Sequence, residues 1–273
     1  MKLFDHKGSA NIRPAAAAGR FYPKDPVELR HLIKGLLAES APADGQAPKA
    51  LIAPHAGYVY SGPIAASAYV QLIRARELIH RIVLVGPSHF VPFAGLATSS
   101  AEAFATPLGL VPLDTAAISR LGALPQVTVL DVAHAHEHAL EVHLPFLQSV
   151  LADFKLIPLV VGEATAEQVC EVLDALWDGP ETRFVISSDL SHYLDSDAAR
   201  RMDRLTADAV EGLRPEDIGE DQACGRIPIR GLLQAARGHG LHAHTVDLRN
   251  SGDTSGPRSQ VVGYGAFIFE EEV

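Results

Sequence analysis

The sequence has few cysteines, few basic residues relative to acidic ones, and no long apolar run. Its two cysteines, Cys170 and Cys224, lie far apart without CxxC spacing, which excludes a disulfide framework and a zinc finger. The 23 Lys and Arg against 33 Asp and Glu argue against nucleic acid or an anionic membrane surface as a partner. No run approaches the roughly 18 apolar residues of a membrane span, and a secretory signal is missing at the start. We therefore expect a cytoplasmic protein that binds neither nucleic acid nor membrane.

What is present is an alternation of strand and helix patterns. Hydrophobic residues make up 47% of the 273, enough for a large core, and α/β architectures often hold this length as one domain. Residues 1–12 show no periodicity and are expected to be a loose tail, so residues 13–273 form the predicted domain. We predict the α/β class, as a single domain with a largely parallel central sheet flanked by helices.

Local signals position the elements. Apolar runs predict strands at 49–53, 82–86, 127–130, 155–161, 184–186, 244–248 and 261–269. Asp25, Asp114 and Thr165 are predicted N-caps, because each precedes a helical pattern. Further helices are expected from Pro63 to about 74, from near 141, from 196 to about 213, and at 228–237.

Three of the predicted strands are followed by a histidine. His55 follows 49–53, His89 follows 82–86 directly after Ser88, and His192 follows 184–186 together with Asp189. Open α/β sheets place their ligands beyond the carboxyl ends of their strands. One loop histidine is commonly structural, whereas three at strand ends are hard to treat as independent. We expect these histidines to converge at one pocket.

Other residues that bind metals in proteins lie in loops or at a helix start. His138, Glu141 and His143 are closely spaced in EHALEVH, and Cys224 precedes the helix at 228–237, whose start would lower the pKa of the thiol. Imidazole, thiolate and carboxylate are common metal ligands. We expect the EHALEVH residues to line the pocket and orient ligand histidines, with Glu141 as the alternative third ligand.

For several candidates a structural role competes with a functional one. Cys170 shares a helical stripe with apolar residues and is expected in the core, while His134 and His136 look like ordinary loop histidines. Tyr58 fits packing at a loop rim and a substrate-facing phenol equally well. The serines of SSDLSH suggest a Ser/His/Asp triad, but without a GxSxG elbow a serine hydrolase is disfavoured.

Ordered motifs over residues 13–269 resemble the Memo family. They are RPAAAAGRFYP, PHAGYVYSG, GPSH, EHALEVHLPFL, SSDLSHY, CGRIPI and VGYGAFIF. The bacterial and archaeal branch is labelled component B of the AmmeMemoRadiSam system, which implies an AMMECR-type protein and a radical-SAM protein as partners. The family fold is similar to that of the extradiol dioxygenases, non-haem iron enzymes with two His ligands and a carboxylate.

The resemblance implies a metal site. It places His55, His89 and Cys224 at the metal-ligand positions, and His192 at the position of the dioxygenases' acid/base histidine. A thiolate in place of the carboxylate suits copper, iron or zinc and removes the requirement for oxygen activation. The implied cofactor is therefore one transition-metal ion, with copper or iron favoured over zinc.

Two functions follow from these expectations. In the first, the protein is a metal-dependent redox enzyme in which His192 moves a proton and Asp189 orients it. In the second, it is a binding module whose pocket, with Tyr58 and Arg226, accepts an anionic small molecule or a phosphorylated peptide without turnover. We favour the first, and the metal and the substrate stay open at this point.

Overall fold

Strands and helices alternate along the computed structural model, which describes residues 11–41, 46–177 and 179–271. The strands are β1 (Ile12–Arg13), β2 (Ala50–Ala53), β3 (Arg81–Pro87), β4 (Leu96–Thr98), β5 (Ala103–Thr106), β6 (Gly109–Pro112), β7 (Val127–Val129), β8 (Lys155–Val161), β9 (Thr182–Ser187), β10 (His192–Leu194), β11 (Leu241–Asn250) and β12 (Val261–Glu271). The helices are α1 (Pro26–Ala38), α2 (Tyr58–Tyr69), α3 (Thr115–Leu121), α4 (Asp131–Ala135), α5 (His138–Glu141), α6 (Leu144–Val150), α7 (Ala166–Asp174), α8 (Ser196–Glu211), α9 (Arg226–Gly238) and α10 (Ser251–Thr254), with 3-10 helices at Val70–Ala75 and Pro215–Asp217. Most of the expected tail, residues 1–10, lies outside the described residues, and Ile12 already belongs to β1.

A parallel centre with antiparallel flanks forms the main sheet. Within the described residues the strand order is β10-β12-β2-β9-β3-β8-β4-β7, and β11 also pairs with β12. The four central strands β2, β9, β3 and β8 run parallel, whereas β12 and β4 join them antiparallel. The parallel centre agrees with the prediction. The insertion of β9 between β2 and β3 was not predicted, because hydrophobic patterns carry no information about strand order.

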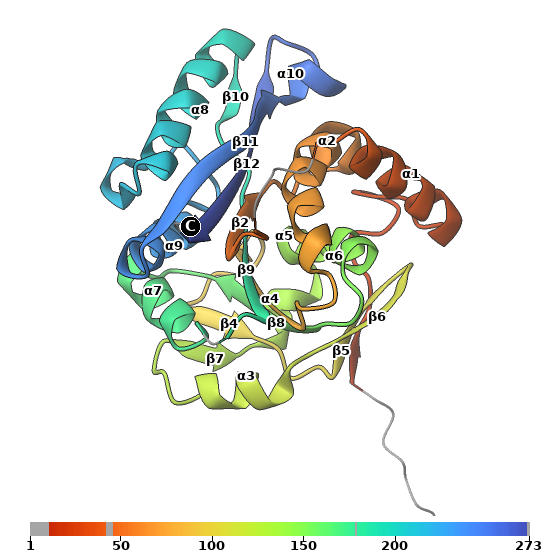
Figure 1. The fold of residues 1–273 in the computed structure, drawn as a ribbon, viewed down its shortest axis with the longest axis vertical. Coiled ribbons are helices and arrows are strands. Elements are labelled where there is room, and N and C mark those ends of the chain that lie inside the picture. The colour runs from red at the N-terminus through yellow and green to blue at the C-terminus, as the bar shows by residue number, and fades with distance from the viewer. Residues whose placement is uncertain (1–10, 42–45, 178, 272–273) are drawn as a thin grey trace, which may run out of the picture.

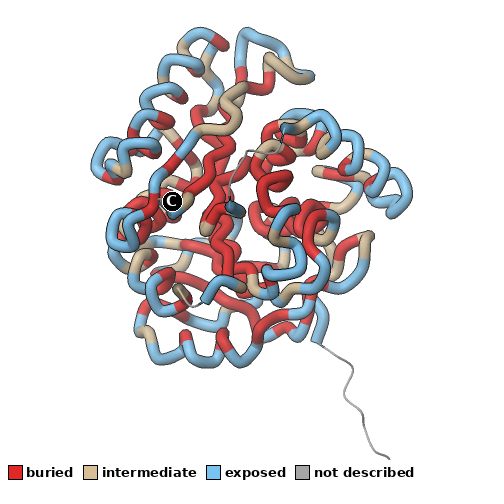
Figure 2. Tube along the Cα trace, viewed as in Figure 1, coloured by how far each residue is buried: buried red, intermediate tan, exposed pale blue. Residues whose placement is uncertain are grey.

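Helices cover both faces of this sheet. In Figure 1, α7, α8 and α9 lie on one side of the central strands and α1, α2, α5 and α6 on the other. Figure 2 shows burial concentrated along the central strands and the inner faces of these helices. Residues 82–85 and 184–186 are fully buried, as expected for strands that are covered on both faces. No helix in the described ranges is long and apolar enough to cross a membrane.

The three predicted N-caps are confirmed. Asp25 accepts from the backbone N–H of Val27 and Glu28, Asp114 accepts from that of Ala117, and Thr165 forms a capping box. Each cap satisfies backbone donors that the first helical turn leaves unpaired.

Helix α2 begins five residues earlier than the proline signal predicted. It starts at Tyr58, so Pro63 lies inside the helix and cannot donate to the carbonyl of Val59. The hydroxyl of Ser255 donates to that carbonyl instead, at 3.0 Å. A hydrogen bond from a residue 196 positions away therefore replaces the one that proline removes, and no local signal reports it.

The expected helix near residue 141 is two short helices. Helix α5 ends at Glu141 and α6 begins at Leu144, with Pro145 in its first turn. The break lies at residues 142–143, and His138, the first residue of α5, lies against His55 and His89 beyond the carboxyl ends of β2 and β3. The described chain is thus a single α/β domain, as predicted.

Burial of His134 makes the stability of this fold depend on pH. The residue is 2% exposed, and its Nε2–H donates to the carbonyl of Ala97 at 3.1 Å. Burial, helped by the positive charge of Arg13, lowers the pKa of His134 from 6.5 to about 4. As the pH falls from 6.5 to about 4, the unfolded chain takes up a proton that the folded chain does not, so acid favours unfolding.

We therefore expect His134→Gln to flatten the acid side of the stability curve. In the wild type, protonation of this histidine lowers the free energy of unfolding by up to about 3 kcal/mol as the pH falls from 6.5, its unfolded-state pKa, to about 4, its folded-state pKa. The glutamine variant lacks this loss of stability. Urea unfolding at pH values across the window measures the slope. His136→Gln, at an exposed neighbour, is the control and should leave the slope unchanged. A wild-type slope in the His134 variant would contradict the prediction.

Candidate metal centre

His55 lies directly beyond β2, and its ring is held in one tautomer. Its backbone N–H donates to Asp189 Oδ1 at 2.8 Å, and its Nδ1 lies 2.7 Å from Ser187 Oγ. The Ser187 hydroxyl donates its single proton to the carbonyl of Ala139 at 2.6 Å, so the histidine must be the donor in its bond with the serine. The Nε2 atom of His55 therefore keeps its lone pair, which is what a metal ligand requires.

His89 lies beyond β3 and is clamped by one carboxylate. Glu137 accepts from the backbone N–H of His89 at 2.7 Å and from its Nδ1 at 2.9 Å. A carboxylate only accepts, so Nδ1 carries a proton, and in the neutral ring Nε2 is the nitrogen that keeps its lone pair. Burial raises the pKa of Glu137, but the hydrogen bonds from His89 and Ala139 outweigh it and lower the pKa to about 2. The carboxylate is thus charged, and it orients His89 as carboxylates orient histidine ligands in metal sites.

His138 completes a group of three. Its ring stacks on His89 with 4.7 Å between centroids and on Phe21 with 4.3 Å. One ring nitrogen from each of His55, His89 and His138 lies within 4.8 Å of the other two. Among the described residues, this group is the one in which three such side chains come close enough to share a metal ion.

The donors of this group suit a metal ion. Burial lowers the pKa of His55 well below 6.5, with the neighbouring His89 and His138 adding to the effect, and burial also lowers the pKa of His138. The rings of His55 and His138 are therefore neutral at neutral pH and available as ligands. In addition, Nδ1 of His138 is buried and makes no hydrogen bond, with Glu137 Oε1 at 3.4 Å. Three imidazoles, two of them with Nδ1 held by a hydrogen bond so that Nε2 faces the group, fit a transition-metal ion.

Cys224 lies beside this group but outside it. Its Sγ is 3.3 Å from Nε2 of His55 and accepts from the backbone N–H of Asp189, also at 3.3 Å. Ligand atoms of one tetrahedral ion are about 3.5 Å apart, so the sulfur can share an ion with His55. Burial, with the Asp189 charge nearby, raises the pKa of the thiol to about 12, opposite to the lowering that the helix start suggested. The desolvation of the sulfur outweighs the hydrogen bonds from Asp189, Ser188 and Gly225, which lower the pKa.

His192 and Asp189 line one cavity together with the three histidines. A cavity of about 460 Å³, called here the histidine cavity, is lined by the three histidines, His192 and Asp189, among others. Asp189 accepts from the backbone N–H of His55 and of Ala56. No hydrogen bond joins it to the His192 ring in the described part of the chain. Contrary to our expectation, Asp189 therefore does not hold the His192 ring through a hydrogen bond. It fixes the loop of His55 instead.

Glu141 points away from the histidines. It is fully buried and accepts from Arg13 at 2.6 Å, from the backbone N–H of Ala16 and Ala17, and from the Tyr22 hydroxyl. These bonds fasten the segment after β1 onto α5. Glu141 thus neither approaches the three-histidine group nor orients it. Glu137, four positions earlier, accepts from His89 instead. The only sequence signal for this role was that Glu137 lies next to His138 in EHALEVH.

The remaining expected pocket residues divide between core and surface. Tyr58 is buried and donates to the carbonyl of Val142, and His143 is buried with Nδ1 bonded to the Tyr69 hydroxyl at 2.7 Å. Neither lines the histidine cavity, because both side chains face the layer between α2 and α6. Ser88 and Arg226 line an adjacent cavity of about 580 Å³ that also touches His89 and Cys224.

The serine-hydrolase alternative lacks its central contact. The hydroxyl of Ser187 donates to the carbonyl of Ala139, and that of Ser188 to the carbonyl of Asp189. No described serine hydroxyl bonds to His192.

Cys170 was expected in the core. It is half-buried at the edge of the core, and its Sγ lies 3.6 Å from the Asp174 carboxylate.

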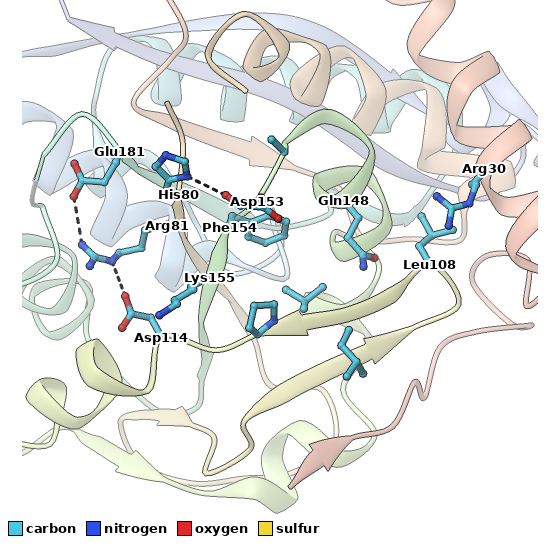
Figure 3. Close-up of a pocket in the computed structure, with 14 residues that line it drawn as sticks. Arg30, His80, Arg81, Leu108, Asp114, Gln148, Asp153, Phe154, Lys155 and Glu181 are labelled. Atoms are coloured by element: carbon cyan, nitrogen blue, oxygen red, sulfur yellow. Dashed lines mark hydrogen bonds and ion pairs between the residues drawn. The ribbon is translucent and has the colours of Figure 1, made fainter. Parts of the chain in front are cut away.

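A separate cavity of about 570 Å³ lies at the opposite edge of the sheet, where β3 and β8 begin (Figure 3). Arg81 bridges Asp114 at 2.9 Å and Glu181 at 3.6 Å there. The carboxylates already compensate the charge of this arginine. These ion pairs tie the starts of β3 and β9 to the cap of α3, which is a structural role.

The fold and the site define an α/β protein with a histidine group at the carboxyl edge of its parallel strands. A family model described as Memo-like protein matches residues 13–268. A MEMO1 family protein from Aquifex aeolicus (strain VF5) is 36% identical over 269 residues, which cover 94% of this chain and 99% of the relative. Another, from Archaeoglobus fulgidus, is 34% identical over 94% of this chain and 99% of its own length. The chain belongs to the Memo family, as its motifs indicated.

The contacts of Glu141 predict that its loss harms the fold rather than the histidine group. Glu141→Gln leaves the buried guanidinium of Arg13 without its counter-charge, and breaking such a pair costs about 3 kcal/mol of unfolding free energy. Urea unfolding measures this loss, with Glu39→Gln on the surface as the control. Replacing both partners, by Arg13→Met with Glu141→Leu, should recover part of it. Full stability of the single variant would contradict the structural role.

Proposed function

We propose that this chain is a metal-dependent redox protein whose ion is held by histidines at the carboxyl edge of the sheet. The observation that carries the proposal is the group of His55, His89 and His138, with ring nitrogens within 4.8 Å of one another. Ser187 and Glu137 fix two of these rings with their lone pairs free, which lowers the cost of ordering ligands around an ion. Cys224, in contact with His55, is a proposed further ligand.

The donor set supports copper or iron over a hard cation. Imidazole and thiolate are ligands for copper, iron and zinc, whereas magnesium and calcium prefer oxygen. Such an ion, when bound, would supply electron transfer or Lewis-acid polarisation of a ligand. Coordination would also keep Cys224 deprotonated, in spite of the raised pKa of its thiol.

The chain's own residues would handle binding and protons. His192 lies on the wall of the histidine cavity, where its ring nitrogens can hold or give up a proton next to a bound molecule. Phe21, Tyr60 and Tyr264 provide apolar surface in the same cavity. In this arrangement His192 would contact a molecule bound in the histidine cavity and would not bind the metal ion.

The alternative, a module that binds a phosphorylated or anionic ligand, has less support. No lysine or arginine lines the histidine cavity in the described part of the chain. Arg226 lines the adjacent cavity, where it is paired with Glu220 at 3.3 Å. Recognition of a phosphate normally uses cations and backbone donors aimed at its oxygens. The charge of the pocket therefore favours the metal-dependent function.

Elemental analysis of tag-free protein purified without oxygen tests the proposal. We expect close to one equivalent of copper or iron per chain in the wild type, and strong loss in His89→Ala and His138→Ala. Cys224→Ser should lose most of its metal if the thiolate is a ligand. His136→Ala is the control, because this exposed histidine lies outside the group. A wild type that neither contains metal nor binds added copper, iron or zinc would refute the proposal.

Glu137→Gln tests the orientation of His89. The variant keeps the shape of the side chain but loses the charge, and loss of such a partner weakens metal binding about 10- to 100-fold. Equilibrium competition with a chelator measures this change. An unchanged affinity would mean that His89 does not depend on Glu137 for its role.

His192→Ala separates proton transfer from metal binding. We expect nearly unchanged metal content and turnover lowered about 10²- to 10⁴-fold, the range of general acid–base groups. Metal-linked oxygen consumption serves as a first assay. Loss of the metal, as complete as in His89→Ala, would make His192 a ligand instead.

A further inference from the structure

Two neighbouring cavities share two of their lining residues. The histidine cavity of about 460 Å³ neighbours a cavity of about 410 Å³ that is lined by Cys224, Met202 and Asp221, among others, and is called here the Cys224 cavity. His192 and Tyr193 line both. They therefore form the wall between the space above the histidines and the space beside the thiol.

Tyr193 has a backbone conformation that its side chain disfavours. Its φ is 62°, in the left-handed region, where a residue with a bulky side chain is strained. The pairing of β10 with β12 shifts register between His192 and Leu194, so the strand bulges at this tyrosine. The side chain is 72% exposed, so packing into the core does not offset the strain.

Contacts on both sides of Tyr193 enforce this conformation. Before it, the backbone N–H of Ser191 donates to the buried carboxylate of Asp203 at 3.0 Å, and the Ser191 carbonyl accepts from Gly263 at 2.8 Å. After it, Leu194 pairs with Val261 of β12. With both flanks fixed, the strained residue projects its ring beside His192, at 5.7 Å between ring centroids. Strain that a fold enforces at a cavity wall is typical of functional positions.

We propose that the Tyr193 ring determines which ligands fit the histidine cavity. The ring confines the ligand to the space above the three histidines and keeps it out of the Cys224 cavity. The volume of this space and the lack of lysine or arginine on its described walls fit a small uncharged molecule. This inference rests on the proposed function, in that the histidine cavity is taken as the ligand site.

The test uses cobalt(II)-loaded protein, whose visible absorption reports ligand binding, with imidazole and the bulkier 4-phenylimidazole as probes. Tyr193→Gly removes the ring and accepts the positive φ. We expect it to bind 4-phenylimidazole at least about tenfold more tightly than the wild type does, because the phenyl group gains apolar contact, with little change for imidazole. Tyr193→Phe keeps the ring and should behave as the wild type.

Leu213→Gly is the matched control. Leu213 is the other described non-glycine residue with positive φ, 49°, and it lies at the end of α8, away from both cavities. Its variant relieves similar backbone strain without altering the wall, so the preference between the probes should not change. An equal gain in Leu213→Gly, or none in Tyr193→Gly, would overturn the proposal.

A second measurement needs no metal. Diethyl pyrocarbonate modifies accessible histidines, and peptide mapping reports the rate at His192 relative to exposed His136 in metal-free protein. We expect a faster relative rate in Tyr193→Gly and a wild-type rate in Leu213→Gly and Tyr193→Phe. Equal rates in all variants would show that the ring does not cover His192 and would overturn the proposal. A wild type that binds neither cobalt nor copper, iron or zinc would refute the metal function, and the modification rates would then decide on Tyr193 alone.

Discussion

The site depends on the parallel pairing of β2, β9 and β3. Parallel strands end at the same edge of a sheet, so the residues that follow them are brought together whatever their distance in sequence. His55 follows β2, His89 follows β3, and the loop of Asp189 follows β9, which lies between them. Asp189 can therefore accept from the backbone of His55, a residue 134 positions away. Strand pairing therefore sets where the loops of the first two histidines begin.

Hydrogen bonds then fix how the rings of these histidines are oriented. Ser187, the last residue of β9, holds His55, and Glu137, from the loop before α5, holds His89. Ser187 also bonds to the carbonyl of Ala139 in α5, so the sheet edge and this short helix are coupled through one hydroxyl. That coupling positions His138 over His89. The histidines thus act as a unit, because the groups that orient two of them also place the third.

Sequence patterns predicted what depends on local physics. Runs of buried apolar residues, helix caps and histidines after strands all depend on nearest neighbours, and the strands, the caps and the position of His55 and His89 followed from them. Such patterns could not predict hydrogen bonds between residues far apart in the sequence. The bond from Ser255 that allows Pro63 inside α2, and the bond of Glu141 to Arg13, join residues 196 and 128 positions apart. Glu141 and Glu137 are both plausible partners of a histidine in EHALEVH, and only the turn of α5 decides that Glu137 faces the site.

The position of Cys224 relative to His138 bears on how an ion would be held. Both contact the ring of His55 from different directions: the sulfur lies 3.3 Å from Nε2, and the His138 ring meets it edge-on with 5.5 Å between centroids. The raised pKa of the thiol means that the sulfur carries its proton until a cation compensates the cost of its charge. His138 has no such cost, since its neutral ring needs to lose no proton to offer a lone pair. His55 and His138 would therefore be available to an ion without that cost, whereas use of the thiolate would release a proton close to Asp189, whose pKa burial raises.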